Sequence, residues 1–226
     1  MASGFFITGT DTEVGKTFVT ALLLRELNRR GQTALGMKPI ASGCVQGEAG
    51  LTNDDVEVLL AAGHHPVPRR VLNPYAFEPP VSPHIAAANA GTNISFEVLK
   101  TAYDELAGQA DTVLVEGAGG WLAPISDVVD MADLAAFLDV PVVLVVGMRL
   151  GCLNHALLTA RAIQASDCRF AGWVANRVTP EMLEFDANLA TLERRIGAPL
   201  LGVVPYAPTG TLPMLGRANL HPLLAV

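Results

Sequence analysis

The residues best suited to chemistry stand near the start of the chain, in the run GTDTEVGKT at positions 9–17. Backbone N–H groups of a glycine-rich loop that opens into a helix form a cradle for anions, because glycine lets phosphate oxygens approach the backbone. Lys16 would neutralise the β- and γ-phosphates of a nucleotide, and the Thr17 hydroxyl would reach Mg²⁺. Five residues, rather than the usual four, separate Gly9 from Gly15. We predict a phosphate-binding loop that is one residue longer than usual, with a plain glycine-rich turn as the alternative.

Two further charged side chains stand at the carboxyl ends of expected strands. Lys38 ends the second expected strand, and Glu116 ends the third and is followed by glycines. In open parallel sheets ligands bind at this edge, and a P-loop fold uses a carboxylate there for Mg²⁺. A solvated lysine is the alternative for Lys38. Asp55 begins an expected helix, so we interpret it as a partner of the helix dipole unless it meets Thr17 and Glu116.

These side chains need a frame of strands and helices. Short β-rich apolar runs recur, each followed by a turn and a helical pattern, which is typical of repeated βαβ units. The expected strands cover 4–8, 33–37, 112–115, 141–146, 171–175 and 200–204. The expected helices cover 16–30, 54–62, 83–90, 96–107, 132–138, 153–165 and 181–196. The pattern predicts a P-loop NTPase-like α/β fold, with six or seven mostly parallel strands and helices on both faces of the sheet.

The chain length favours one folded unit. A chain of 226 residues is long enough for a single α/β domain, and we expect residues 1–226 to form one ATP-binding domain. Six of the fifteen prolines fall between positions 66 and 83. We interpret this proline-rich segment as an irregular surface excursion, because no second periodic core follows it. A domain linker is the alternative.

Composition argues against several classes of partner. Fifteen Lys and Arg against 22 Asp and Glu give a net charge of −7 without a basic run, so neither nucleic acid nor an anionic membrane surface is expected. The longest apolar run, 140–148, is interrupted by Pro141 and Gly147 and is far shorter than the roughly 18 residues of a membrane span. The first residues do not resemble a signal peptide. We expect a cytoplasmic protein with small-molecule partners.

Cysteine and histidine positions predict no metal cluster. Cys44, Cys152 and Cys168 are far apart, which fits neither a disulfide framework nor a CxxC metal site, so we expect three reduced thiols. The five histidines lack partners at metal-ligand spacing, and we interpret them as surface or capping residues.

Weaker signals follow the remaining expected strands. The turn over 147–154 leads into a helix and offers backbone N–H groups to a carboxylate, although an ordinary turn fits equally well. Asn176 ends the fifth expected strand, and Pro205 and Tyr206 follow the sixth. These three residues could frame a nucleotide base at the same edge of the sheet.

Together these segments resemble the dethiobiotin synthetases, the ATP-dependent carboxylases of the biotin pathway, over nearly the whole chain. The segments that carry the resemblance are GTDTEVGKT at 9–17, KPIASG at 38–43, NPY at 73–75, SPH at 82–84, VEGAGG at 115–120, LGCLNH at 150–155 and GWVAN at 172–176. The longer interval between Gly9 and Gly15 is the one this family shows. Arg177 departs from the family, in which an acidic residue is common at this position, and this bears on the choice of nucleotide.

The resemblance implies a reaction. The substrate 7,8-diaminopelargonic acid would react with CO₂ and Mg²⁺·ATP to give the cyclic urea dethiobiotin, ADP and phosphate, through a carbamate and a mixed carbamic–phosphoric anhydride. No protein nucleophile is required, so positioning and charge stabilisation would do the catalytic work. Lys16 and Lys38 would supply positive charge to the two anionic reactants, because a lysine with the usual pKa of about 10.4 is charged near neutral pH.

The same resemblance implies a role for each matching position. Lys38 and Lys16 would be catalytic, and Thr17, Asp55 and Glu116 would bind Mg²⁺. ATP would contact Glu13, Val14, Gly15, Lys16, Thr17, Phe18, Asp55, Glu116, Gly117, Ala118, Gly119, Asn176, Arg177, Pro205, Tyr206 and Ala207. The diamine or its carbamate would contact Thr12, Lys38, Ser42, Gly151, Cys152 and Asn154. The family acts as a homodimer in which the 151–154 turn of one subunit receives the substrate carboxylate bound mainly by the other.

Three other classes of protein compete with this interpretation. A regulatory ATPase switch of the deviant Walker type carries a signature lysine early in its loop, where this chain has Thr10 and Asp11. An amidase-type ligase that activates carboxylates usually carries a glutaminase domain, for which 226 residues leave no space. A non-catalytic binding module is the third, and ADP release stimulated by a diamine would exclude it.

Overall fold

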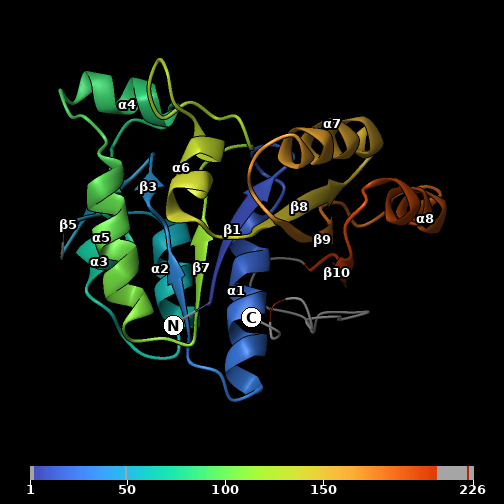
Figure 1. Ribbon diagram of the computed structural model, residues 1–226, viewed down its shortest axis with the longest axis horizontal. Helices are drawn as coiled ribbons and strands as arrows, with labels where there is room; N and C mark the ends of the chain where they lie inside the picture. The colour runs from blue at the N-terminus through green and yellow to red at the C-terminus, as the bar shows by residue number, and fades with distance from the viewer. Residues whose placement is uncertain (1–2, 49, 208–222, 224–226) are drawn as a thin grey trace.

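The computed structural model describes residues 3–48, 50–207 and 223 (Figure 1). Its centre is a parallel sheet with the strand order β10–β9–β8–β1–β7–β2. The strands are β1 (Ser3–Gly9), β2 (Ala34–Met37), β7 (Thr112–Glu116), β8 (Val142–Met148), β9 (Phe170–Arg177) and β10 (Leu200–Val204). All six expected strands are present, with bounds that differ by at most two residues. Strand β1, which leads into the expected phosphate loop, lies between β7 and β8.

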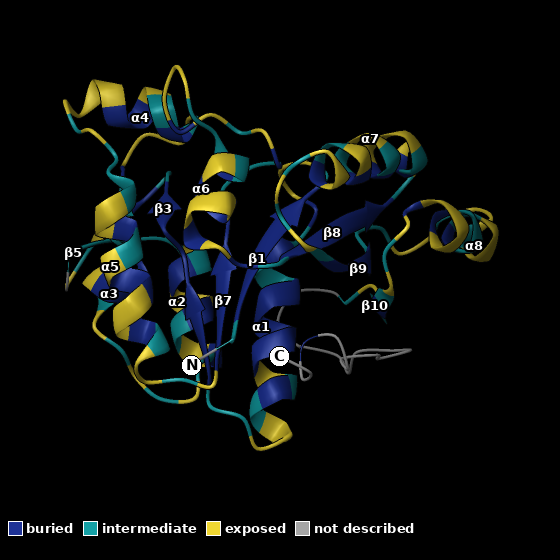
Figure 2. Ribbon diagram, viewed as in Figure 1, coloured by how far each residue is buried: buried dark blue, intermediate teal, exposed yellow. Residues whose placement is uncertain are grey.

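Helices cover both faces of the sheet. One face packs against α1 (Lys16–Arg29) and α2 (Asp54–Ala62). The other packs against α5 (Phe96–Ala107), α6 (Met131–Leu138), α7 (Cys152–Gln164) and α8 (Phe185–Arg195). Because both faces are covered, the central strands are apolar throughout, as in VVLVVGM of β8, rather than alternating. Figure 2 shows the strands buried and the helices exposed along their outer sides.

The last helix begins four residues later than the sequence pattern predicted, at Phe185 instead of Glu181. Glu184, the residue before it, has a φ of 53°, a left-handed conformation that cannot be part of a right-handed helix. The helical pattern over 181–184 therefore predicted a helical turn that the backbone does not form.

The proline-rich segment is more ordered than expected. It contains α3 (Arg69–Leu72) and β6 (Tyr75–Ala76), and it leads into α4 (Pro83–Asn89). Strand β6 pairs in parallel with β3 (Ile40–Ala41), which continues the chain beyond Lys38. The expected surface position is confirmed, but the expectation of an irregular segment was wrong, because backbone pairing fixes it against the carboxyl edge of the main sheet. A short hairpin of β4 (Val45–Gly47) and β5 (Gly50–Thr52) lies nearby in sequence.

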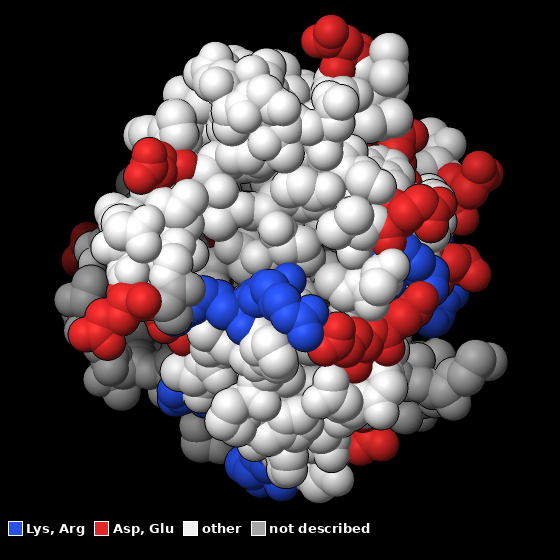
Figure 3. Space-filling view, turned by 90° about the vertical axis from the view of Figure 1, so that its left-hand side faces the viewer, with Lys and Arg blue, Asp and Glu red and all other residues white. Residues whose placement is uncertain are grey.

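Several surface charges form ion pairs. Arg69 lies against Glu57, Arg70 against Glu105, and Lys100 against Asp104. Figure 3 shows the face on the left-hand side of Figure 1. Lys and Arg side chains on it lie in short groups beside Asp and Glu, without a continuous basic surface. Among the described residues, none of the helices has the length and apolar character needed to cross a bilayer.

Candidate active site at the carboxyl edge of the sheet

The phosphate loop joins the end of β1 to the start of α1. Gly15 precedes the helix with a φ of 80°, which favours glycine. A Cβ atom at this position would also collide with the side-chain amide of Asn176. That amide donates a hydrogen bond of 2.8 Å to the carbonyl oxygen of Val14 and so ties the end of β9 to the loop. No side chain caps the helix, so its first N–H groups are free to bind an anion.

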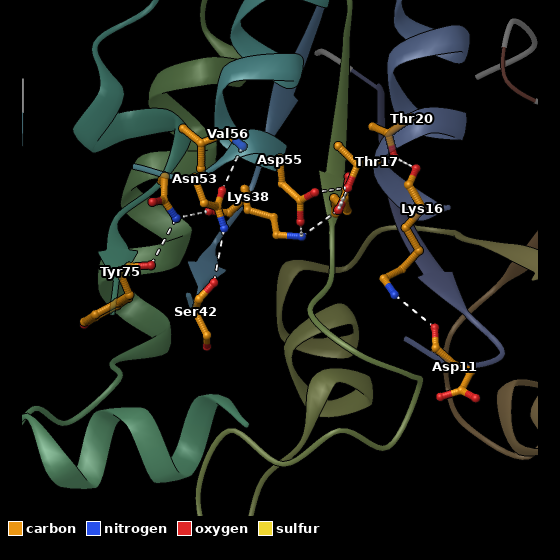
Figure 4. A network of polar contacts seen from close by, with 12 residues as sticks. Asp11, Lys16, Thr17, Thr20, Lys38, Ser42, Asn53, Asp55, Val56 and Tyr75 are labelled. Carbon is orange, nitrogen blue, oxygen red and sulfur yellow. Dashed lines mark hydrogen bonds and ion pairs between the residues drawn. The ribbon is translucent and has the colours of Figure 1, made fainter. Parts of the chain in front are cut away.

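Lys16 is the first residue of α1 and is buried against the loop. Its Nζ donates to the carbonyl oxygen of Asp11 at 3.1 Å, so the ammonium lies over the loop rather than in solvent (Figure 4). Burial, followed by repulsion from Lys38, lowers the pKa of Lys16 to about 8. An arriving phosphate would oppose both effects, because it supplies the negative charge that Lys16 lacks.

Four polar side chains meet beside the loop (Figure 4). The Thr17 hydroxyl lies 2.7 Å from Asp55 Oδ1 and 2.7 Å from Glu116 Oε1. Lys38 Nζ lies 2.8 Å from Asp55 Oδ2 and 2.6 Å from Glu116 Oε1. The condition set for Asp55 is therefore met, since it shares its geometry with Thr17 and Glu116. The four residues come from α1, α2, β7 and the end of β2, which are far apart in sequence.

Asn73 holds the backbone of Lys38 in place through its side-chain amide. The Asn73 amide nitrogen donates to the carbonyl oxygen of Lys38 at 2.7 Å and to that of Tyr75 at 3.0 Å. Both partners are acceptors, which fixes the orientation of the amide. Asn73 is 6% exposed, so these hydrogen bonds are made away from water. The side chain joins the strand end that carries Lys38 to the start of β6.

Asp55 is positioned by the beginning of α2. Asn53 caps this helix by accepting a hydrogen bond from the backbone of Val56, and its amide nitrogen donates to the carbonyl oxygen of Ser42 at 3.3 Å. The cap fixes the first turn, which carries Asp55, and links it to the loop after β3. Asp55 thus has both the predicted place in the first turn and a role in the cluster.

The charges of the cluster support one another. Burial alone would lower the pKa of Lys38, but attraction by Glu116 and Asp55 outweighs burial, and the pKa is raised. Burial alone would raise the pKa of Asp55, but the adjacent Lys38 ammonium outweighs it, and the pKa is lowered. Lys38 is therefore charged across the physiological range, and so is Asp55.

The donor set suits a hard divalent cation. Thr17, Asp55 and Glu116 offer only oxygen atoms, and Mg²⁺ prefers a few such ligands together with water and phosphate oxygens. Glu116 is fully buried, and no described residue makes a hydrogen bond to its Oε2 atom. An unpaired carboxylate oxygen in the interior is costly unless a cation or a water molecule reaches it. In the described part of the chain no group of three or more His, Cys, Asp and Glu side chains gathers elsewhere to hold a metal.

A cavity of about 800 Å³ opens in front of the loop and the cluster. It brings together Thr12, Glu13, Gly15, Lys16, Thr17, Phe18, Lys38, Ser42, Asp55, Glu116, Ala118 and Gly119 of the predicted site. The Ser42 hydroxyl is buried in the cavity lining, and in the described part of the chain it has no hydrogen-bond partner. One concave site therefore contains the phosphate loop, the metal candidates and three of the predicted substrate contacts, Thr12, Lys38 and Ser42.

Eight further residues line the cavity and were not predicted to be part of the site: Ile40, Asn53, Pro80, Val81, Ser82, Pro83, Gly120 and Ala123. Four of them, at 80–83, form a wall that the sequence did not reveal. The segment 77–83 is fastened to the loop after β3, because Gly43 donates to the carbonyl oxygen of Pro79 and Cys44 to that of Phe77. The signal was present in the motif SPH at 82–84, which contributed only to the family resemblance. Prolines suit this wall because their fixed φ makes a stiff apolar surface.

The predicted base contacts lie outside this cavity. Asn176 is buried at the end of β9, where its amide nitrogen binds the phosphate loop. Arg177 follows on the opposite face of the strand, where its guanidinium lies 4.4 Å from the centre of the Phe185 ring. Pro205 and Tyr206 are exposed after β10. The described residues do not assemble a closed base pocket from these parts.

The turn before α7 is also separate from the cavity. Gly151 and Asn154 are exposed, whereas Cys152 is buried and its backbone N–H donates to the carbonyl oxygen of Arg149. Burial raises the pKa of the Cys152 thiol, so this side chain is a neutral packing group. The contacts that this turn offers a ligand come from Gly151 and Asn154.

Solved structures of distant sequence share this fold. MinD of Aquifex aeolicus aligns with a TM-score of 0.54 at 18% identity, covering 92% of this chain and 84% of its own. Chloroplast FtsY of Physcomitrella patens aligns with a TM-score of 0.57 at 15% identity, covering 100% of this chain and 64% of its own. At these identities the likeness establishes the P-loop NTPase-like fold and nothing about activity.

Sequence relatives are much closer. Residues 3–213 match a family model described as an AAA domain. The ATP-dependent dethiobiotin synthetase of Nitrosospira multiformis is 52% identical over 91% of this chain and 89% of its own length. The corresponding protein of Xylella fastidiosa strain 9a5c is 47% identical over 97% of both chains. That of Aromatoleum aromaticum is 52% identical over 89% of this chain and 90% of its own. The chain belongs to the ATP-dependent dethiobiotin synthetase family.

Proposed function

We propose that this chain catalyses the ATP-dependent carboxylation and ring closure of 7,8-diaminopelargonic acid to dethiobiotin, with release of ADP and phosphate. The observation that carries the proposal is the cluster of Lys38, Asp55, Glu116 and Thr17 beside the phosphate loop, in one cavity with Ser42. Family membership supplies the reaction, and the geometry supplies the groups that it needs.

The reaction joins two anions, so charge is the main obstacle. One substrate amine takes up CO₂ to form a carbamate and releases a proton. A carbamate oxygen then attacks the γ-phosphorus of ATP, and the bond to ADP breaks. The second amine attacks the carbonyl carbon, the C–O bond to phosphate breaks, and the ring closes. Each step needs reactants held in line and negative charge offset, which pre-oriented cations can supply.

Two lysines reach the reactants from opposite sides of the cavity. Lys16 projects from the first turn of α1 and would draw charge from the β- and γ-phosphates. Lys38 enters from the end of β2 and would hold the carbamate oxygen as it approaches phosphorus. The two carboxylates that border Lys38 keep it protonated, so it acts as a fixed positive charge rather than as a proton donor.

The remaining lining fits an aliphatic diamine. Thr12 and Ser42 offer hydroxyl groups in the same cavity as the two lysines, and the Ser42 hydroxyl has no partner among the described residues. The wall formed by Ile40, Pro80 and Val81 offers apolar contacts to a hydrocarbon chain. We assign the diamine end of the substrate, where the carbamate forms, to the hydroxyl groups. Its methylene chain is assigned to the apolar wall.

Thr17, Asp55 and Glu116 would hold Mg²⁺ together with the nucleotide phosphates. The cation would supply charge neutralisation for the transferred phosphoryl group. Among the solved structures of similar fold, MinD of Pyrococcus horikoshii is a complex with Mg-ADP, which is consistent with this assignment.

The site would be completed by a second copy of the chain. The 151–154 turn lies outside the cavity, and its exposed Gly151 and Asn154 would receive the substrate carboxylate of a partner subunit. Leu150 is 98% exposed and Leu158 58%, which gives this end of α7 an apolar surface for such a contact. Light scattering should show a dimer, and a monomer with full activity would contradict this arrangement.

Phosphate release tests the proposed reaction. The purified chain is supplied with Mg²⁺·ATP and bicarbonate, with and without 7,8-diaminopelargonic acid, and the cyclic urea is measured by mass spectrometry. Diamine-dependent phosphate with an equal amount of cyclic urea is expected. Lys38→Gln should lower kcat by about 100-fold or more, because one oriented charge is lost from the reacting centre.

Lys100→Gln is the matched control, since Lys100 lies on the surface of α5 in an ion pair with Asp104. This variant should keep the activity of the wild type. ATP turnover that is indifferent to the diamine would leave phosphate binding in place and contradict the assigned substrate.

A further inference from the structure

Lys38 occupies the same oxygen atoms that the proposed metal site offers. Its Nζ lies 2.8 Å from Asp55 Oδ2 and 2.6 Å from Glu116 Oε1. The Thr17 hydroxyl, the third proposed ligand, lies 2.7 Å from that same Glu116 oxygen. In this state the ammonium group, rather than a metal ion, satisfies the two carboxylates.

We propose that Lys38 is an internal competitor of the divalent cation, held on Asp55 and Glu116 until metal binding displaces it into the cavity. The inference rests on the proposed function, from which it takes the three metal ligands. It adds that the binding of the metal and the release of the catalytic lysine are one event.

The charge balance of the cluster supports competition. Two carboxylates, Asp55 and Glu116, balance two ammonium groups, Lys38 within the cluster and Lys16 near it, so the site is neutral without a metal. A divalent cation added to it would leave an excess of two positive charges inside the protein. Charges that are close together and poorly hydrated repel strongly. The lowest-cost response is for a flexible side chain to leave, and Lys38 has a four-carbon stem that allows it.

Only one of the two lysines is bound to the carboxylates. Lys16 donates to the backbone of Asp11, within the phosphate loop, and makes no hydrogen bond to Asp55 or Glu116. Removal of Lys16 therefore changes the net charge of the site by the same amount as removal of Lys38, without vacating the metal-binding oxygens. This difference separates competition for the same atoms from general electrostatic repulsion.

The displaced ammonium has a place to go. Lys38 lines the cavity together with Ser42 and Thr12, the two residues assigned to the carbamate. Lys38 is 4% exposed while it is bound to the carboxylates, so an anionic substrate gains little from it in that position. Because Mg²⁺ arrives with ATP, the cation for the carbamate would become available only when the phosphate donor is present.

Metal binding by the protein alone tests the proposal. Free Mn²⁺ is counted by electron paramagnetic resonance while the protein is titrated in the absence of nucleotide and diamine. The wild type should bind Mn²⁺ weakly, and Lys38→Met should bind it at least tenfold more tightly. Lys38→Arg keeps the positive charge on the carboxylates and should bind as weakly as the wild type. Lys16→Met, the charge-matched control, should tighten binding by less than threefold.

A crystal structure with Mn²⁺ and a non-hydrolysable ATP analogue gives the second readout. The ammonium of Lys38 should lie beyond hydrogen-bond distance from both Asp55 and Glu116. The proposal is overturned if Lys38→Met leaves Mn²⁺ affinity unchanged, if Lys16→Met tightens it equally, or if Lys38 keeps both contacts with the metal bound. These measurements do not depend on diamine turnover, so failure of the assigned reaction would be seen separately in the phosphate-release assay.

Discussion

Raising the pH from 7 to 9 should weaken ATP binding by about tenfold, because Lys16 loses its proton across this interval. Burial and the charge of Lys38 lower the pKa of Lys16 to about 8. A group with that pKa is roughly nine-tenths protonated at pH 7 and roughly one-tenth protonated at pH 9. The association constant should follow the protonated fraction, since a neutral amine offers the phosphates no charge.

The sign follows from linkage. Bound phosphate favours the charged form of Lys16, so its pKa is higher in the complex than in the free protein. ATP binding therefore takes up a proton, and affinity is highest below pH 8 and is lost as the pH rises through that value. At pH 8 each bound ATP should take up about half a proton. The last phosphate ionisation, near pH 6, is already about nine-tenths complete at pH 7, so it changes little over this range.

Isothermal titration calorimetry in two buffers of different ionisation enthalpy measures both quantities. Affinity and proton uptake are recorded at pH 7, 8 and 9 for the wild type and for Lys16→Arg. A guanidinium group stays charged at all three pH values, so the variant should bind ATP with a nearly constant affinity. Constant affinity in the wild type without proton uptake, or an equal slope in Lys16→Arg, would refute the reasoning.

Three further substitutions test how the site is held in place. Gly15→Ala combines a left-handed backbone with a clash against Asn176, so it should abolish ATP binding by calorimetry while circular dichroism shows a folded chain. Asn73→Ala removes two hydrogen bonds, one of them to the backbone of Lys38, and should lower the free energy of unfolding by about 2 kcal/mol. It should also lower kcat by more than tenfold and leave the KM for ATP unchanged. An unchanged kcat would contradict the positioning role. Asn53→Ala removes a helix cap and should lower the free energy of unfolding in urea by about 1 kcal/mol, and an unchanged midpoint would show that the cap is dispensable.

Much of the frame could be predicted because its signals are local. Each strand of the main sheet is an apolar run with turn residues after it, and both faces are covered, so the runs are continuous and easy to find. The phosphate loop was recognisable from its spacing and from the strand and helix on either side of it. The expected strand ends then identified Lys38 and Glu116, because parallel strands bring their carboxyl ends to one edge.

Contacts between distant segments were the part that sequence could not specify. The pairing of β3 with β6 sets Ile40 opposite Tyr75 and Ala41 opposite Ala76, and strands of two residues leave no periodic pattern in the sequence. The proline-rich segment was therefore interpreted as a surface excursion, although it forms a wall of the cavity. The joint contact of Thr17 and Lys38 with the same two carboxylates likewise depends on four elements meeting in space.

The alternation of side chains along β9 gives two adjacent predicted ATP contacts different surroundings. Asn176 and Arg177 are adjacent in sequence, and both were predicted to contact ATP. Successive side chains of a strand face opposite sides, so Asn176 turns to the phosphate loop and Arg177 to Phe185 on α8. The role of Arg177 in base recognition stays a prediction, and any such contact would come from its backbone or from a rearranged side chain.

The fate of one oxygen atom tests the central claim most directly. In the proposed reaction the carbamate oxygen that attacks phosphorus leaves with the phosphate when the ring closes. A single-turnover reaction with ¹⁸O-labelled CO₂, quenched before the label exchanges with water, should give inorganic phosphate that carries one ¹⁸O atom, in step with the cyclic urea. Unlabelled phosphate formed together with the cyclic urea would contradict attack of the carbamate on ATP, and labelled phosphate that depends on Lys38 would support the account as a whole.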